Sequence, residues 1–355
     1  MNLRSGMSWL TAILVLVPFA VAAPESAPVD LGTLGGSFSQ ANGINPNQSA
    51  VVGFASLTGD TNSHAFRQIL GGSIKDLGTL HLDPSTPTGN STAAAVSPIG
   101  IVAGTSDFDS VDLTTGTLNR FRHAFYFANG TMMDVGTLGG SEAFGNGGWN
   151  NFVVGSSFVA NDTALHAFLW KASTHSITDL GTLPGGLNSE ALAINTNSVV
   201  AGSSDGSDGT THAVVWVGKQ VHDLGTLGGS FAKATAINGK NVPVGFSFIA
   251  DDAEAHAFVG SLQDIGTLGG SFASANAIND EGVVVGFSNT AGDADVHAFV
   301  WSPAHGMVDL NSLLPAGSPW DLQSANGISS NGTIVGVGTI NGESHAFRWS
   351  LGVDF

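Results

Sequence analysis

Two short phrases alternate along almost the whole chain, and this repeat restricts the possible folds more than any other feature. The first is Asp-Leu-Gly-Thr-Leu or a close variant, and it begins at Asp30, Asp76, Asp134, Asp179, Asp223, Asp264 and Asp309. The second is His-Ala-Phe or His-Ala-Val, and it begins at His64, His123, His166, His212, His256, His297 and His345. Units of this length cannot bury a core alone, so the pattern indicates structural repeats that pack on one another.

Each unit is consistent with four short β-strands. The first carries Ala-x-x-Ile-Asn, as in residues 41–45, and the second carries a central glycine, as at Gly53. The third carries His-Ala-Phe-x-Trp, as in residues 166–170, and the fourth carries Asp-Leu-Gly-Thr-Leu. In the third strand, histidine, phenylalanine and tryptophan alternate and should share one face. The glycine should let a neighbouring sheet approach. Residues 106–122 read as a long inserted loop in the second unit.

The ends of the chain predict how the repeats close. A fourth strand comes first, at residues 29–34, and the last unit supplies only its first three strands, at residues 323–350. Four-stranded units of about 45 residues are typical of propeller blades. We therefore predict an all-β fold, a seven-bladed β-propeller of four-stranded blades, closed by the N-terminal strand completing the last blade.

The repeated histidines and aspartates predict a structural pairing. In each unit the histidine opens the third strand and the aspartate lies on the antiparallel fourth, so the two can meet across the hairpin. The predicted pairs within units are His64–Asp76, His123–Asp134, His166–Asp179, His212–Asp223, His256–Asp264 and His297–Asp309. Closure of the ring adds a seventh pair, between His345 and Asp30. Catalysis and metal ligation are the alternatives, but a single site does not need seven copies.

The N-terminus has the pattern of a signal peptide. Arg4 precedes an apolar run, residues 9–19, and Ala20-Val21-Ala22 resembles a cleavage site. We expect residues 1–22 to be a signal peptide and residues 23–355 to form a single β-propeller domain of seven repeats. An N-terminal membrane anchor is the alternative. No second apolar span follows, so no transmembrane segment is expected after signal removal.

Charge narrows the classes of ligand. The formal net charge is −18, which makes nucleic-acid binding improbable. Acidic loops between the second and third strands contain the calcium candidates Asp205, Asp208, Asp251, Asp252, Glu254, Asp293 and Asp295. Solvated turns are the competing interpretation. In propeller geometry these loops share one face with the Gly-Thr-Leu-Gly-Gly-Ser loops, and we expect a ligand on that face, at the channel mouth. Trp149 can reach the channel, although core packing is the commoner fate of tryptophan.

The alternating Asp-Leu-Gly-Thr-Leu-Gly-Gly-Ser and His-Ala-Phe-x-Trp phrases resemble the HAF family of probable extracellular repeat proteins, a mainly bacterial group. The resemblance covers nearly all of the mature chain. It departs at His212-Ala213-Val214, and Gln68 and Gly260 stand where tryptophan is usual. The resemblance implies secretion and a repeat architecture, and it supplies no catalytic residues.

These observations together predict a secreted or cell-surface protein, extracellular or periplasmic, that acts as a binding or structural scaffold. The expected partner is an extracellular protein or a polysaccharide, and the chain is expected to be a monomer that is not an enzyme and has no cofactor. Two alternatives stay open. One is a calcium-stabilised module of an envelope or matrix, and the other is a secreted glycan-acting propeller enzyme.

Overall fold

The computed structural model describes residues 27–80, 89–111 and 116–351. This part of the chain is all β, with only four short 3-10 helices beside the strands. The predicted signal peptide, residues 1–22, lies outside the described residues. Within them, no helix has the length and apolar character that crossing a membrane would require.

Antiparallel pairing joins the strands into groups of four. Group 1 consists of β2 (Gly35–Ile44), β3 (Ala50–Leu57), β4 (Ser63–Ile69) and β5 (Ile74–Asp76). Group 2 consists of β6 (Ser91–Val96), β7 (Val102–Val111), β8 (Leu118–Ala128) and β9 (Thr131–Asp134). Group 3 consists of β10 (Gly139–Trp149), β11 (Phe152–Val159), β12 (Leu165–Lys171) and β13 (Ser176–Asp179). Group 4 consists of β14 (Ser189–Ile194), β15 (Val199–Asp205), β16 (Thr211–Val217) and β17 (Gln220–Gly225).

The remaining groups have the same order. Group 5 consists of β18 (Gly228–Ile237), β19 (Pro243–Ile249), β20 (Ala255–Val259) and β21 (Gln263–Gly266). Group 6 consists of β22 (Gly269–Ile278), β23 (Val284–Thr290), β24 (Val296–Ser302) and β25 (Gly306–Asp309). Group 7 consists of β26 (Trp320–Ile328), β27 (Thr333–Ile340) and β28 (Glu343–Ser350), and β1 (Val29–Asp30) pairs with β28 as its fourth strand.

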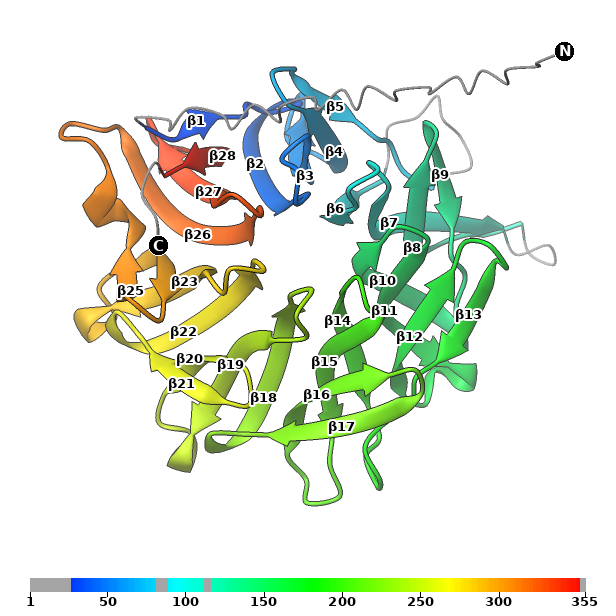
Figure 1. Ribbon diagram of the computed structural model, residues 1–355. Helices are drawn as coiled ribbons and strands as arrows, with labels where there is room; N and C mark the ends of the chain where they lie inside the picture. The colour runs from blue at the N-terminus through cyan, green and yellow to red at the C-terminus, as the bar shows by residue number, and fades with distance from the viewer. Residues whose placement is uncertain (1–26, 81–88, 112–115, 352–355) are drawn as a thin grey trace, which may run out of the picture.

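The groups stand side by side around a common centre, in sequence order, with the first strand of each group innermost (Figure 1). Isolated parallel bridges also link some neighbouring groups, such as Thr211 to Phe231, so that the hydrogen-bonded sheets have 8, 4, 12 and 4 strands. A radial array of four-stranded antiparallel units is a β-propeller arrangement.

Apolar side chains from neighbouring groups form the core between them. Phe168 and Trp170 of group 3 pack with Ala124 and Tyr126 of group 2 in one buried cluster. Another cluster combines groups 7 and 1, which stand at opposite ends of the sequence, and its members include Val335, Ala346, Ala41, Val51 and Phe66. Each group is therefore covered on both faces, which explains why consecutive residues of the third strand, such as Ala167 and Phe168, are both fully buried.

The central glycine of the second strand has a different role from the predicted one. A Cβ at Gly155 would overlap the carbonyl oxygen of Phe144 and lie 3.0 Å from the Phe168 ring. Both contacts are within group 3, on the strands either side of Gly155. The glycine therefore makes room for the group's own first strand and for the repeated phenylalanine, rather than for a neighbouring sheet.

Three strand boundaries differ from the sequence prediction. β1 ends at Asp30 rather than at residue 34, because the Asp30 carboxylate accepts a hydrogen bond from Gly32 N, and Gly32 turns the chain with φ of 76°. The first strands are longer than the Ala-x-x-Ile-Asn phrase, and β2 begins at Gly35. Residues 106–122 are not simply a loop, because β7 and β8 extend into this segment and pair from Ser106–His123 to Val111–Leu118.

Candidate functional site

All seven predicted histidine–aspartate pairs are confirmed. The Nδ1 atom of each histidine lies 2.7 to 3.0 Å from a carboxylate oxygen of its aspartate, including His345 and Asp30, which are 2.9 Å apart. In each unit the same carboxylate also accepts from the backbone N–H two residues later. The repeated aspartate therefore joins two strands and turns the chain after the fourth, which gives both the histidine and the aspartate a structural use.

Asp76 illustrates the electrostatics of the pair. Burial by itself would raise the pKa of Asp76, but hydrogen bonds from His64 and from Gly78 N outweigh it and hold the pKa below its ordinary value of 3.8. A carboxylate that accepts two hydrogen bonds in its charged form has no proton to donate. His64 must therefore carry its proton on Nδ1, which faces Asp76.

A second repeated bond was not predicted. A buried serine of the second strand accepts a hydrogen bond from the backbone N–H of the leucine that ends the preceding Gly-Thr-Leu or equivalent phrase. The pairs, leucine first, are Leu80–Ser106, Leu138–Ser157, Leu183–Ser204, Leu227–Ser247 and Leu268–Ser288. The signal was present, because serine follows the central glycine by two residues in each case. These bonds tie each crossing loop to the group that it enters.

The acidic loops lie on the same face as the Gly-Gly-Ser loops, as predicted. Asp60, Asp162, Asp252 and Asp293 each accept from the backbone N–H of a Gly-Gly-Ser serine, at 2.7 to 2.8 Å. The hydrogen bond from Ser230 N lowers the pKa of Asp252 below 3.8, and that from Ser271 N does the same for Asp293. The second glycine of the phrase is needed there, because a Cβ at Gly229 would lie 2.5 Å from the Asp252 carboxylate.

The other calcium candidates are dispersed among these loops. Asp205 accepts from Asn188 and Thr211, Asp208 from Thr210, and Glu254 lies 3.1 Å from His256 Nε2. Asp251 and Asp295 are exposed. Within the described residues, no three His, Asp or Glu side chains come together as a metal-holding group.

Asparagines of the first strand link neighbouring groups around the centre. One level is formed by the asparagine after the isoleucine, as where Asn195 donates to Asn238 O and Asn238 donates to Asn279 O. A second level is formed by an asparagine earlier in the same strand, as where Asn276, three residues before Asn279, donates to Ala325 O. Asn326 donates to Ala41 O at 2.9 Å and so joins group 7 to group 1. These amides are therefore largely occupied in holding the groups together.

A pocket of about 320 Å³ lies at the centre, on the face opposite the acidic loops. All seven groups or their turns supply lining residues, which are Pro46, Pro98, Trp149, Ile194, Asn195, Thr196, Ile237, Asn238, Gly239, Ile278, Asn279, Asp280, Ile328 and Ser330. Trp149 thus reaches the central opening, and it also packs against the buried cluster of groups 3 and 4, so both interpretations of the sequence apply. We name this cavity the axial pocket. Its position on this face was not predicted.

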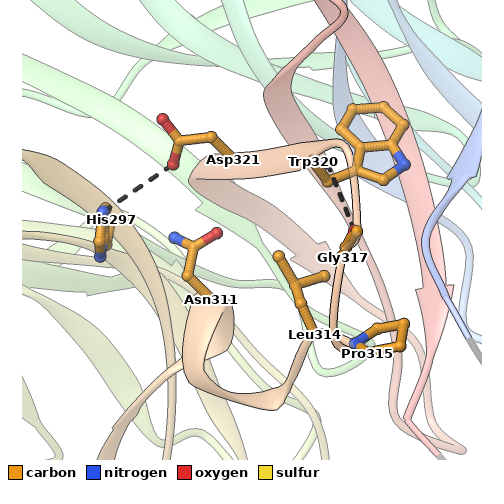
Figure 2. A pocket seen from close by; sticks show the side chains of 8 residues that line it. His297, Asn311, Leu314, Pro315, Gly317, Trp320 and Asp321 are labelled. Carbon is orange, nitrogen blue, oxygen red and sulfur yellow. Dashed lines mark hydrogen bonds and ion pairs between the residues drawn. The ribbon is translucent and has the colours of Figure 1, made fainter.

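A second pocket, of about 350 Å³, lies on the acidic-loop face between groups 6 and 7. Its lining residues are His297, Asn311, Leu314, Pro315, Gly317, Ser318, Trp320 and Asp321 (Figure 2). It lies where a 3-10 helix (Leu310–Leu313) and the loop after it replace the usual Gly-Thr-Leu-Gly-Gly-Ser connection. We name this cavity the side pocket. It lies on the face where a ligand was expected, but between groups 6 and 7 rather than at the channel mouth.

Comparisons with known proteins give similarity of structure only. No family model matches the chain, and no curated protein matches it in sequence. The β-propeller domain of the Trilobed protease from Pyrococcus furiosus is 10% identical, with a TM-score of 0.45 over 88% of this chain and 95% of that one. An oligogalacturonate lyase from Vibrio parahaemolyticus is 9% identical, with a TM-score of 0.46 over 94% of this chain and 92% of that one. What those proteins act on is not carried over to this chain.

Proposed function

We propose that this chain is an exported binding scaffold, a seven-bladed β-propeller closed by its N-terminal strand, which takes an apolar group of an extracellular partner into the axial pocket. The observation that carries the proposal is that every group contributes to one central pocket. Export is supported by the signal-peptide pattern of residues 1–22 and by the resemblance to the HAF family.

The contacts at the two chain ends support a closed ring of seven blades. β1 pairs with β28, and Leu31 N donates to Ala346 O. Trp320 Nε1 donates to Pro28 O, and Ala346 N donates to Ser39 Oγ. These bonds join residues about as far apart in sequence as the described chain allows. The pairing covers the edge of β28 that faces away from β27, and an exposed edge invites pairing with other chains.

The use of the repeated polar residues favours binding over catalysis. The histidines, the aspartates of Asp-Leu-Gly and the second-strand serines hold strands and loops in place, as their bonds show. Residues that are committed in this way in all seven units, or in five of them for the serines, are poor candidates for a single reaction centre. Function is then expected where the repeat is broken or where all units meet, and the axial pocket is such a place.

The lining of the axial pocket suits an apolar group. Four isoleucines, two prolines and Trp149 supply the walls, and no Lys or Arg side chain is among the lining residues. The asparagine amides at the mouth are bonded to neighbouring groups. Binding pockets of this kind gain most of their affinity from apolar contact, with a few polar groups at the edge fixing orientation.

The proposal is tested with the chain from residue 23 to residue 355 and the neutral apolar dye N-phenyl-1-naphthylamine. One dye molecule per chain should bind, with increased dye fluorescence, and Trp149→Ala should weaken binding about tenfold, as expected when a large contact surface is removed. Leu187→Ala is the control, because Leu187 is an exposed apolar residue outside the axial pocket. Equal binding by the Trp149→Ala variant, with an unchanged circular dichroism spectrum, would contradict the proposed site. A reporter fused after residue 22 tests export separately.

A further inference from the structure

The side pocket exists because one contact of the repeat is missing at a single junction. At the other six junctions, the residue just before the histidine is bonded or bridged to a residue in or just before the next group's first strand. Ser63 N donates to Asn90, Arg122 N to Glu142 and Leu165 N to Asn188. Thr211, Ala255 and Ser344 instead form a parallel bridge with Phe231, Phe272 and Phe38 respectively.

In group 7, Asp321 stands where the other groups have the residue that makes this contact. Leu322 pairs with Gly338, and Ser39 pairs with Ala55; Gly338 and Ala55 each lie two residues after the central glycine of their strand. Asp321, one residue before Leu322, is therefore equivalent to Phe38, one residue before Ser39. Within the described residues, no corresponding bond or bridge joins Asp321 to Val296, and β24 and β26 belong to different sheets. No backbone bond therefore closes this position beside His297, and the side pocket lies there (Figure 2).

Two hydrogen-bond acceptors face each other in this opening. His297 Nδ1 lies 2.7 Å from Asp309 Oδ2, and Asp309 Oδ1 accepts from Asn311 N, so the proton shared by His297 and Asp309 belongs to Nδ1. Neutral His297 then presents an unprotonated Nε2 to the pocket. Asp321 Oδ1 lies 3.9 Å from that nitrogen, which is beyond the usual 2.7–3.2 Å of a hydrogen bond. A donor atom to one side of the line between the two atoms could lie within hydrogen-bond distance of both.

The other lining residues restrict what that donor can be. The Asn311 amide is occupied, since it both donates to and accepts from the backbone of Leu322. Leu314 and Pro315 supply an apolar wall, together with Trp320, whose indole N–H is bonded to Pro28 O. No Lys or Arg lines the pocket, and the chain carries a net charge of −18. The chemistry required is a positively charged donor attached to an apolar chain.

We propose that the side pocket binds a primary ammonium group on an aliphatic chain, the chemistry of a lysine side chain or an alkyl diamine. The ammonium lies between His297 Nε2 and the Asp321 carboxylate, and the aliphatic part lies against Leu314 and Pro315. The inference goes beyond the proposed function and does not depend on the axial pocket, which lies on the opposite face.

Isothermal titration calorimetry with Nα-acetyl-lysine methylamide and with 1,5-diaminopentane tests the proposal on residues 23–355. Asp321→Asn should weaken binding about tenfold or more, equivalent to about 1.4 kcal/mol. Asp321→Phe, which gives group 7 the phenylalanine of groups 1, 5 and 6, should abolish it. Asp295→Asn is the matched control, because it removes the same charge from an exposed residue outside the side pocket. The ratio of the two affinities distinguishes a peptide side chain from a free diamine.

Two carboxylates face His297, Asp309 from β25 and Asp321 from β26, and only Asp321 lies beside Nε2. Asp321 is therefore the carboxylate whose change should alter the binding of both amines. Equal affinity in the wild type and Asp321→Asn, or binding of Zn²⁺ alone with no binding of either amine, would overturn the proposal.

Discussion

At the residue scale, the histidine of each unit is distinguished by what lies beside its second ring nitrogen. His256 Nε2 faces Glu254 at 3.1 Å, while Nδ1 faces Asp264 at 2.8 Å. His123 instead lies flat against Phe108, with ring centroids 4.2 Å apart. The same repeated residue therefore has a constant partner on one side and a unit-specific environment on the other.

His256 gives the clearest pH prediction. Burial lowers the pKa of His256, but Asp264 and Glu254 outweigh it and raise the pKa above 6.5. A raised pKa in the folded state means that protonated His256 stabilises the fold fully below pH 6.5, and that this contribution is lost as pH rises through the folded pKa. Histidine-selective NMR titration should give a value above 6.5 that falls in Glu254→Gln. An unchanged value in the variant would refute the assigned cause.

Ser157 tests the bond that the sequence reading missed. Its side chain is fully buried, and its Oγ accepts from Leu138 N at 2.9 Å. Ser157→Ala leaves that N–H without its acceptor, so the free energy of unfolding should fall by about 1–3 kcal/mol. Urea denaturation measures the change. Ser176→Ala, at an exposed serine, is the control and should have little effect; a similar loss in both variants would argue against a specific role for the bond.

At the scale of elements, each acidic loop is held by a bond to the loop that enters its own group. The segments before Asp252 and Asp293 turn with two successive residues of positive φ, at 66° and 53° for Asp251 and Asp252 and at 71° and 54° for Gly292 and Asp293. Short polar residues and glycine tolerate this left-handed conformation best. The acidic composition of these loops is consistent with calcium ligands, but the left-handed turn also explains why Asp and Gly occur at these positions.

The calcium alternative is tested by thermal melts of residues 23–355 in excess Ca²⁺ and in a chelator. Because Asp252 and Asp293 each already accept a backbone N–H, we expect equal midpoints. A site filled at 100 times its dissociation constant would add about 2.7 kcal/mol of stability. A clear rise of the midpoint in Ca²⁺ would show a metal site in the loops and would favour the calcium-stabilised module over the simple scaffold.

The sequence predicted strand order and pairing better than strand ends. Period-two patterns and fixed spacing place the side chain of His345 within reach of Asp30 without any knowledge of distance, because the same strand register repeats in every unit. The end of β1 was misplaced, since the aspartate that forms the pair also turns the chain. The side pocket could not be predicted, because it depends on Asp321 failing to make a contact that three different residue types make elsewhere.

At the scale of the whole molecule, the fold depends on contacts between groups as well as on those within them. Hydrophobic clusters span neighbouring groups, and two levels of asparagine bonds run around the centre. Such a ring places residues from all groups around one axis, where no single repeat could form a pocket. It also makes the junction of groups 7 and 1 the point on which the account depends, because only there must distant parts of the sequence meet.

The most direct test of the closed ring is a thiol bridge across that junction. The chain has no cysteine, so Val29→Cys with Arg348→Cys introduces a single pair, at residues that are Cα partners in β1 and β28. Dibromobimane, a fluorescent reagent that bridges two nearby thiols, should react within one chain and raise the melting temperature. Val29→Cys with Ser176→Cys is the control and should not be bridged. Bridging in neither variant, or equally in both, would contradict a ring closed by the N-terminal strand.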